Sequence, residues 1–136
     1  MWKNIDNKEL NFTNLYFEKV MFANNKHNFV FSTDKEGEFL YIIIDGRAHT
    51  CRLMDNFHIS FYKDKYISKS DIKNVFSKSS IYYTDISEYL DWFRKNSFPD
   101  SEKEELYHFY INSEDYTVEF ITDEMPDISV IKKENG

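Results

Sequence analysis

The first half of the chain alternates short apolar runs with turn residues, in the pattern of antiparallel strands. Runs at 15–22, 28–32 and 39–44 are rich in Phe, Tyr, Val and Ile, which pack well on a pleated sheet. Residues 39–44 are apolar on both alternations, as in a strand covered on both faces. The five residues 33–37 end in glycine and predict a hairpin loop. We therefore expect an antiparallel meander.

The dipeptide Asp45-Gly46 predicts a further hairpin. Two-residue type I′ turns need positive φ at both central positions, and Asp-Gly meets that requirement. The turn would lead from the 39–44 strand into a fourth strand over 47–53. Residues 57–62 alternate apolar and polar side chains and predict another strand.

The middle of the chain has helical spacing. Ser70 is a suitable N-cap for a helix over 71–78, with Ile72, Val75 and Phe76 facing inward. Asp85 is a suitable N-cap for a helix over 86–96, which Phe98-Pro99 would end. Glu88 follows Asp85 by three residues, close to a capping box. One face of the second helix is apolar at i, i+3, i+4 and i+7, through Ile86, Tyr89, Leu90 and Phe93.

The last part of the chain returns to strands, predicted over 106–111 and 116–122 around the turn-prone residues 112–115. Residues 128–131 predict a short final strand. The alternation leaves open which face of the 106–111 strand is buried. The order of strands, helices and strands indicates the α+β class. A length of 136 residues indicates a single domain over 1–136.

Composition removes several classes of protein. Hydrophobic residues make up 41% of the chain, which is too many for a disordered protein. The single cysteine, Cys51, excludes an intrachain disulfide, and no spacing of His, Cys or carboxylates matches a metal motif. Residues 1–10 contain no apolar signal-peptide core. We expect a cytoplasmic protein with no cofactor and no metal.

The net charge of −7 is concentrated in one segment. Residues 1–98 hold 14 Lys and Arg against 13 Asp and Glu, and residues 128–136 have a net charge of +1. Residues 99–127 hold one lysine and ten acidic residues, a net charge of −9. Negative charge argues against direct binding of nucleic acid, because phosphates attract cations.

Acidic groups mixed with tyrosines suit docking on a basic protein, because carboxylates steer the encounter and tyrosines supply stiff contact area. A solvated hairpin edge, charged to prevent pairing with other edges, is the competing interpretation. The predicted partner-binding residues are Asp100, Glu102, Glu104, Glu105, Tyr107, Tyr110, Glu114, Asp115, Tyr116, Glu119, Asp123 and Glu124.

A small enzyme is an alternative of a different class. His49 and His58 would face each other on neighbouring strands, where two imidazoles can act as acid and base in RNA cleavage. Cys51 lies near His49, but no elbow or oxyanion turn accompanies it. A half-buried thiol is the simpler interpretation of Cys51.

The profile of a small, acidic, aromatic-rich domain without a catalytic motif resembles the bacterial immunity proteins of contact-dependent growth inhibition and related polymorphic toxin systems. The resemblance implies a non-enzymatic inhibitor that binds one toxin domain, usually a basic nuclease, one to one. It implies neither membrane nor direct nucleic-acid binding. Small phage-encoded inhibitors, including anti-CRISPR proteins and nucleic-acid mimics, share this profile. An adaptor subunit of a larger assembly is a further alternative.

Overall fold

The fold is described from a computed structural model of the chain. The structure describes residues 2–5, 14–45, 48–55, 64–76, 80–97 and 105–133. Within these residues no helix has both the length and the apolar character needed to cross a membrane.

The described residues form nine strands and two helical segments. The strands are β1 (Lys3–Asn4), β2 (Leu15–Ala23), β3 (Lys26–Thr33), β4 (Glu38–Asp45), β5 (Thr50–Asp55), β6 (Ile81–Thr84), β7 (Tyr107–Asn112), β8 (Tyr116–Thr122) and β9 (Asp127–Lys132). The helical segments are α1 (Lys69–Asp71), which continues as the π-helical η3 (Ile72–Phe76), and α2 (Glu88–Asn96).

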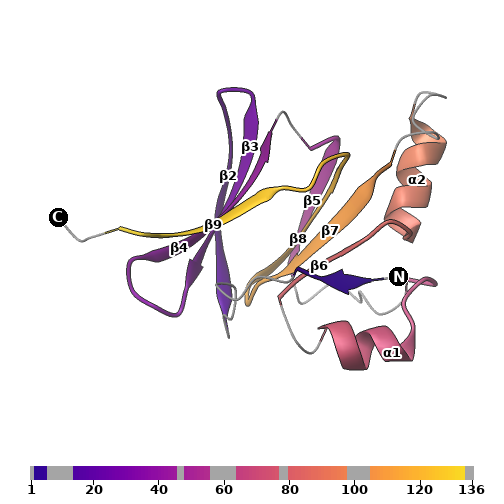
Figure 1. The fold of residues 1–136 in the computed structure, drawn as a ribbon, viewed down its shortest axis with the longest axis horizontal. Coiled ribbons are helices and arrows are strands. Elements are labelled where there is room, and N and C mark those ends of the chain that lie inside the picture. The colour runs from indigo at the N-terminus through magenta and orange to yellow at the C-terminus, as the bar shows by residue number, and fades with distance from the viewer. Residues whose placement is uncertain are drawn as a thin grey trace.

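The elements are arranged in three layers (Figure 1). An outer antiparallel sheet has the strand order β2-β3-β4-β9. It packs on a central antiparallel sheet with the order β1-β6-β7-β8-β5, and α1 and α2 lie on the far side of that sheet. The α+β class predicted from the sequence is confirmed.

The first three predicted strands form the expected meander, with the predicted loop ending at Gly37, where φ is +75°. The predicted hairpin from β4 into a fourth meander strand is wrong. β4 pairs with β9, while β5 pairs with β8 in the central sheet. The physical reason is Arg52 of β5, whose guanidinium is bonded to Glu119 of β8. Gly46 lies outside the described residues, as does the predicted strand at 57–62.

Both helices begin at a serine other than the predicted cap. Ser68, not Ser70, caps α1 through a complete capping box with Asp71. Ser87, not Asp85, caps α2, and its Oγ accepts a hydrogen bond of 3.1 Å from the Leu90 N–H. The predicted inward residues Phe76, Tyr89 and Leu90 are buried, whereas Ile72 and Ile86 are exposed.

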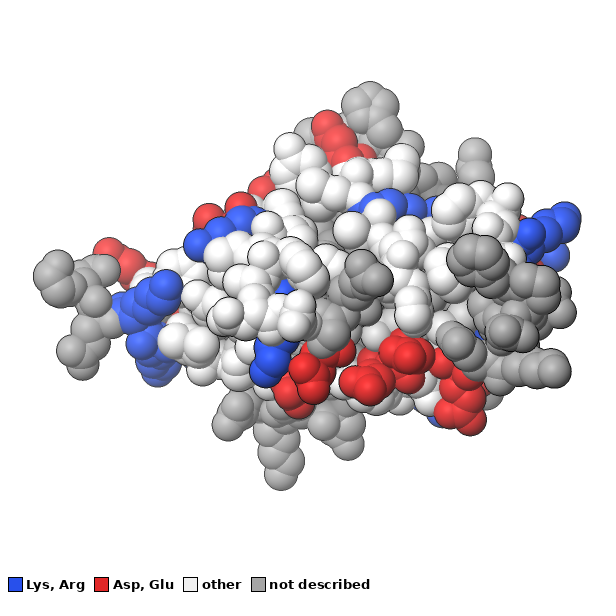
Figure 2. Space-filling model, turned by 90° about the horizontal axis from the view of Figure 1, so that it is seen from above, with Lys and Arg blue, Asp and Glu red and all other residues white. Residues whose placement is uncertain are grey.

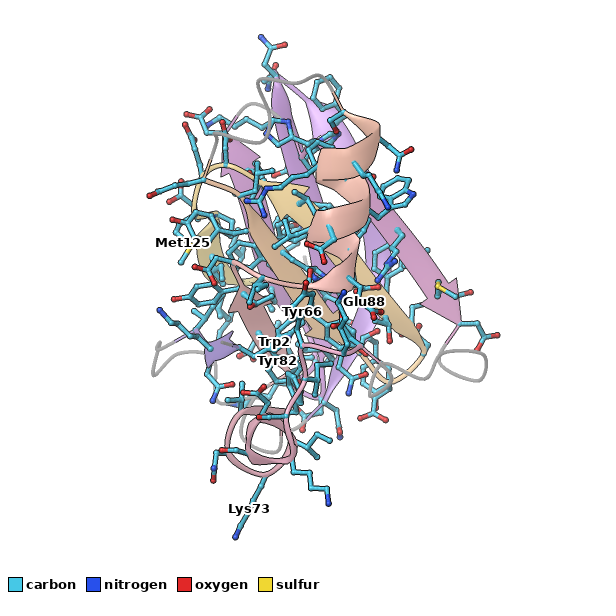
Figure 3. The ribbon with its side chains drawn as sticks, turned by 90° about the vertical axis from the view of Figure 1, so that its right-hand side faces the viewer. Trp2, Tyr66, Lys73, Tyr82, Glu88 and Met125 are labelled. Carbon is cyan, nitrogen blue, oxygen red and sulfur yellow. The ribbon has the colours of Figure 1, made fainter. Side chains whose placement is uncertain are left out.

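The segment before α1 holds the first turn of α2 (Figure 3). One carboxylate oxygen of Asp64 accepts a hydrogen bond of 3.1 Å from the Glu88 N–H. The Tyr66 hydroxyl donates to Asp91 at 2.6 Å. The bond to Asp64 satisfies a backbone donor at the helix start and adds negative charge where the helix dipole favours it, and the Tyr66 bond ties the segment to Asp91.

The main core lies between the two sheets. Phe29 of β3 stacks on Phe120 of β8 at 4.7 Å, and Phe120 stacks on Phe109 of β7 at 5.1 Å. The other face of β7 carries His108 and Tyr110, which are buried on the helix side. The sequence predicts that one face of this strand is exposed. In the structure both faces are covered, one by the outer sheet and the other by the helical layer.

The stacked phenylalanines give a first prediction. Phe120→Ala removes the central ring of the stack and leaves a cavity, so we expect it to lower the free energy of unfolding by about 3–5 kcal/mol. Phe22→Ala is the matched control, because the Phe22 side chain is 57% exposed, and it should cost below about 1 kcal/mol. Urea denaturation measures both. Equal losses in the two variants would contradict this packing.

Candidate functional site

The exposed acidic residues at the ends of the β7–β8 hairpin form two groups rather than one surface, and Asp127 is exposed at the start of β9. The register pairs Tyr107 with Thr122 at one end of the β7–β8 hairpin and Asn112 with Thr117 at the other. Glu105, Asp123 and Glu124 therefore lie at the first end. Glu114, Asp115 and Tyr116 lie at the second end, about 20 Å away along the strands.

Two of the predicted partner-binding residues are not at the surface. Tyr110 is 4% exposed and Glu119 is 2% exposed, because helices and N-terminal residues cover the outer face of the central sheet. The expectation that both contact a partner is corrected accordingly. Asp100, Glu102 and Glu104 lie outside the described residues.

The second group holds the hairpin turn together. Oδ1 of Asp115 accepts hydrogen bonds from the Ser113 hydroxyl at 3.0 Å and from the Tyr116 N–H at 3.1 Å. It also accepts one of 3.1 Å from the Phe17 N–H of β2. This carboxylate therefore closes the turn and ties the two sheets together, which explains its presence without a partner.

The first group and the nearby Asp85 of the β6–α2 connection form what we call the acidic rim. It is defined as Asp85, Glu105, Asp123 and Glu124, all exposed. Tyr107 lies among them and its hydroxyl donates to Glu105 at 3.4 Å. The neighbouring Glu105 carboxylate raises the pKa of Tyr107, and partial burial and Asp85 act in the same direction. Figure 2 looks down on the molecule, and acidic side chains gather along one edge of the face it shows.

Three buried polar side chains and the exposed Arg52 form a hydrogen-bonded chain that we call the Ser87–Arg52 network. His108 Nδ1 lies 2.8 Å from the Ser87 hydroxyl, and His108 Nε2 lies 2.8 Å from Glu119 Oε1. The Arg52 guanidinium donates to both oxygens of Glu119, at 2.5 and 2.9 Å. Ser87 and His108 are no more than 1% exposed.

The hydrogen bonds assign the protons in this network. Burial lowers the pKa of His108 below its ordinary value and outweighs the opposing hydrogen bond to Glu119, so the imidazole is neutral at pH 7. Its Nε2–H then donates to Glu119, and Nδ1 accepts from the Ser87 hydroxyl. The oxygen of Ser87 remains free to accept from the Leu90 N–H, so every group is satisfied.

The charge on Glu119 is balanced by the same contacts. Burial alone raises the pKa of this carboxyl, but hydrogen bonds from His108 and Arg52 outweigh burial and lower the pKa. Burial opposes the charge of Arg52, but the hydrogen bond to Glu119 and the attraction of nearby negative groups together outweigh burial and raise the pKa of the guanidinium. The network is therefore an ion pair with a neutral imidazole attached.

The order serine, histidine and glutamate matches the chemistry of a hydrolase triad, but this serine is placed differently. Ser87 is fully buried and its oxygen is held by the helix backbone, so in this conformation no substrate reaches it. The network links α2 to β7 and β8 of the central sheet, and it links the edge strand β5 to its neighbour β8. The sequence offered no signal for it, because Ser87 lies inside the helix predicted over 86–96.

The other catalytic candidates lie apart. His49 is exposed, 3.8 Å from Asp123 and beside the ring of Phe93, and His58 lies outside the described residues. Cys51 is exposed on β5, not half-buried as predicted. In the described part of the chain, no three His, Cys, Asp or Glu side chains are placed to hold a metal.

The comparisons with known proteins give no relatives. No family model, no curated protein and no solved structure matches this chain. The site is therefore interpreted from its own chemistry.

Neutral buried His108 predicts a dependence of stability on pH. The unfolded chain binds a proton to this histidine below pH about 6.5, whereas the folded chain, with its lowered pKa, does not. The free energy of unfolding should therefore have its highest value above pH 6.5 and should fall as the pH drops below 6.5. Protonation of Glu119, whose folded pKa is also lowered, adds a further loss below about pH 4.5.

Urea denaturation at a series of pH values between 7.5 and 5.5 measures the first of these losses. His108→Gln should flatten the decline that begins near pH 6.5. His49→Gln, an exposed histidine changed in the same way, should keep the wild-type slope. A slope that is unchanged in His108→Gln would contradict the assignment of a neutral imidazole.

The Ser87 hydroxyl makes two hydrogen bonds, one with the Leu90 N–H and one with His108 Nδ1, and replacing Ser87 should remove both. Ser87→Ala leaves Leu90 without its cap and the buried His108 Nδ1 without a donor, so we expect a loss of about 2–4 kcal/mol. Ser68→Ala removes a half-exposed cap from α1 and should cost only about 1 kcal/mol. Thermal or urea unfolding of the two variants tests this, and equal losses would argue against the histidine bond.

Proposed function

We propose that this protein is a non-enzymatic inhibitor, an immunity protein that neutralises a basic toxin domain, of nuclease type, in a one-to-one complex. The observation that carries the proposal is the acidic rim, in which four exposed carboxylates come from three segments and those of Glu105 and Asp85 act on Tyr107. The exposed Met125 follows Glu124 directly in the β8–β9 connection.

The rim has the composition of a docking site for a cationic cleft. Its carboxylates repel one another in the free protein, and Lys and Arg of a partner relieve that repulsion. Tyr107 and Met125 are residue types enriched at protein interfaces. A nuclease must attract phosphates with a basic cleft, so a rim of carboxylates competes for the same surface.

The buried polar network supports the non-enzymatic part of the proposal. Its serine, histidine and glutamate are satisfied internally and closed to solvent. The carboxylate of Asp115 is likewise used inside the fold. In the 99–127 segment, Glu105, Asp123 and Glu124 of the rim are exposed, so a partner can reach their carboxylates.

Co-expression tests the proposal. The C-terminal domain of a large reading frame encoded directly upstream is the expected partner, so it should arrest growth alone and not when this protein is present. The purified pair should form a one-to-one complex whose association slows with added salt. Growth arrest that persists with this protein present, or a complex insensitive to salt, would contradict the proposal.

Charge-reversal variants distinguish binding through the rim from an effect of net charge. The double variant Glu105→Lys, Glu124→Lys should weaken binding by about 2 kcal/mol or more, roughly 30-fold in Kd. The double variant Glu18→Lys, Glu114→Lys changes the net charge equally at the opposite end of the hairpin and should bind nearly as the wild type does. Calorimetry measures both. Equal weakening would point to net charge rather than the rim.

A further inference from the structure

The outer face of the β2-β3-β4-β9 sheet is strongly apolar. The even-numbered apolar residues of β4 belong to the core between the two sheets, so Phe39, Tyr41 and Ile43 point to the opposite face. An antiparallel strand whose second face meets water normally carries polar residues there. β4 instead has the sequence pattern of a strand covered on both faces.

The register of the four strands arranges this face in rows that cross the sheet. Residues directly opposite each other in an antiparallel pair share a face. Read from β2 to β9, three successive rows are Met21-Asn28-Ile43-Asp127, Lys19-Val30-Tyr41-Ser129 and Tyr16-Ser32-Phe39-Ile131. Seven of these twelve side chains are apolar, so they form a patch centred on β4.

The patch faces outward. Tyr16 and Ile131 are each 40% exposed, and Phe39, Tyr41 and Ile43 are half-buried. Among the described residues, no buried cluster includes these five side chains. Both helices lie on the far side of the central sheet (Figure 1). A contiguous apolar patch at a protein surface marks an interaction site.

The charges around the patch are balanced and ordered. Lys19 of β2 and Asp127 of β9 lie on opposite edges, one row apart. Lys26 of β3 lies opposite Asp45 of β4, beyond the first row. Lys133 follows β9, with Nζ 5.6 Å from the centroid of the Phe39 ring. Exchanging β2 with β9 and β3 with β4 therefore brings each lysine of the strands to an aspartate, so the face is complementary in charge to itself.

We propose that a second copy of the chain covers this face, with the two outer sheets packed face to face about a two-fold axis parallel to the strands. Stacked sheets lie about 10 Å apart with their strands nearly aligned. The axis sets β2 against β9 of the second copy and β3 against β4 of the second copy. Lys26 then faces Asp45 of the second copy, and Lys19 lies one row from Asp127 of the second copy.

Charge decides both the axis and the occupant. An axis across the strands, through the middle row, would set Lys19 against Lys19 of the second copy, and like charges in an interface are unfavourable. A basic partner of the kind proposed for the rim would meet Lys19 and Lys26, and an acidic partner would meet Asp45 and Asp127. A second copy is the partner that meets every one of these four charges with its opposite.

The patch has the size that such a dimer requires. Four strands about 4.8 Å apart and about 25 Å long present a projected area of about 450 Å². The relief of the side chains increases the accessible area, so two copies bury more than about 1,000 Å², as a specific interface needs. Interfaces between identical chains are also the more apolar ones. The dimer uses none of the four rim carboxylates, so the inference does not rest on the proposed function.

Light scattering over a range of concentrations measures the association. The wild type should have twice the mass of one chain at high concentration and should dissociate on dilution. Ile131→Lys places a charge against the apolar patch and should raise the dissociation constant by about tenfold or more. Leu53→Lys is the matched control, because Leu53 is similarly exposed, at 46%, on the central sheet, and it should dimerise as the wild type does. A wild type that is monomeric at every concentration would overturn the proposal.

Charge reversal identifies the occupant. Lys19→Asp sets aspartate near aspartate at both edges of the dimer, and Asp127→Lys sets lysine near lysine, so each variant alone should dimerise about tenfold more weakly. A mixture of the two variants makes both contacts attractive and should dimerise as the wild type does. Within one chain these residues lie about 14 Å apart across the sheet, so only contact between two copies gives this rescue.

Both reversed positions are exposed, and urea denaturation of each variant checks that the fold is retained. A mixture that dimerises no better than the separate variants would overturn the proposed pairing. So would single variants that dimerise with wild-type affinity, because the four charges would then lie outside the interface.

Discussion

The buried carboxylate of Glu119 is the constraint on which the arrangement of the chain depends. An ionised carboxylate removed from water costs several kcal/mol unless charges and hydrogen bonds replace its hydration. Glu119 sits in β8, between two other strands of the central sheet. It therefore needs donors from both sides, and it receives them from Arg52 of β5 and His108 of β7.

This requirement explains the course of the chain after β4. A tight turn would place the next strand beside β4, yet the chain crosses to the other sheet and pairs with β8. There Arg52 reaches Glu119 and lies over the ring of Tyr89, at 3.9 Å from the centroid. β4 is completed instead by β9, which supplies Ile128 and Val130 to the space between the sheets. The ion pair and the burial of these apolar side chains both favour the observed membership of the two sheets.

The local elements could be predicted from the sequence because their signals are local. Apolar alternation located the strands of the hairpin 106–122, and the spacing of Tyr89 and Leu90 located the buried face of α2. The pairing of β5 could not be predicted, since it depends on residues 67 positions apart in the chain. Counting charges treated Glu119 as part of an acidic surface, because a count cannot distinguish a hydrated carboxylate from one paired with arginine in a core.

The same distinction changes what the excess negative charge means. Glu119 is paired with the cationic Arg52, and Oδ1 of Asp115 accepts hydrogen bonds from within the fold, so Glu119 has no uncompensated charge for a partner. The carboxylates of the rim lie beyond the strand ends and are exposed. An electrostatic partner responds to local potential rather than to net charge, so it would approach along the strands.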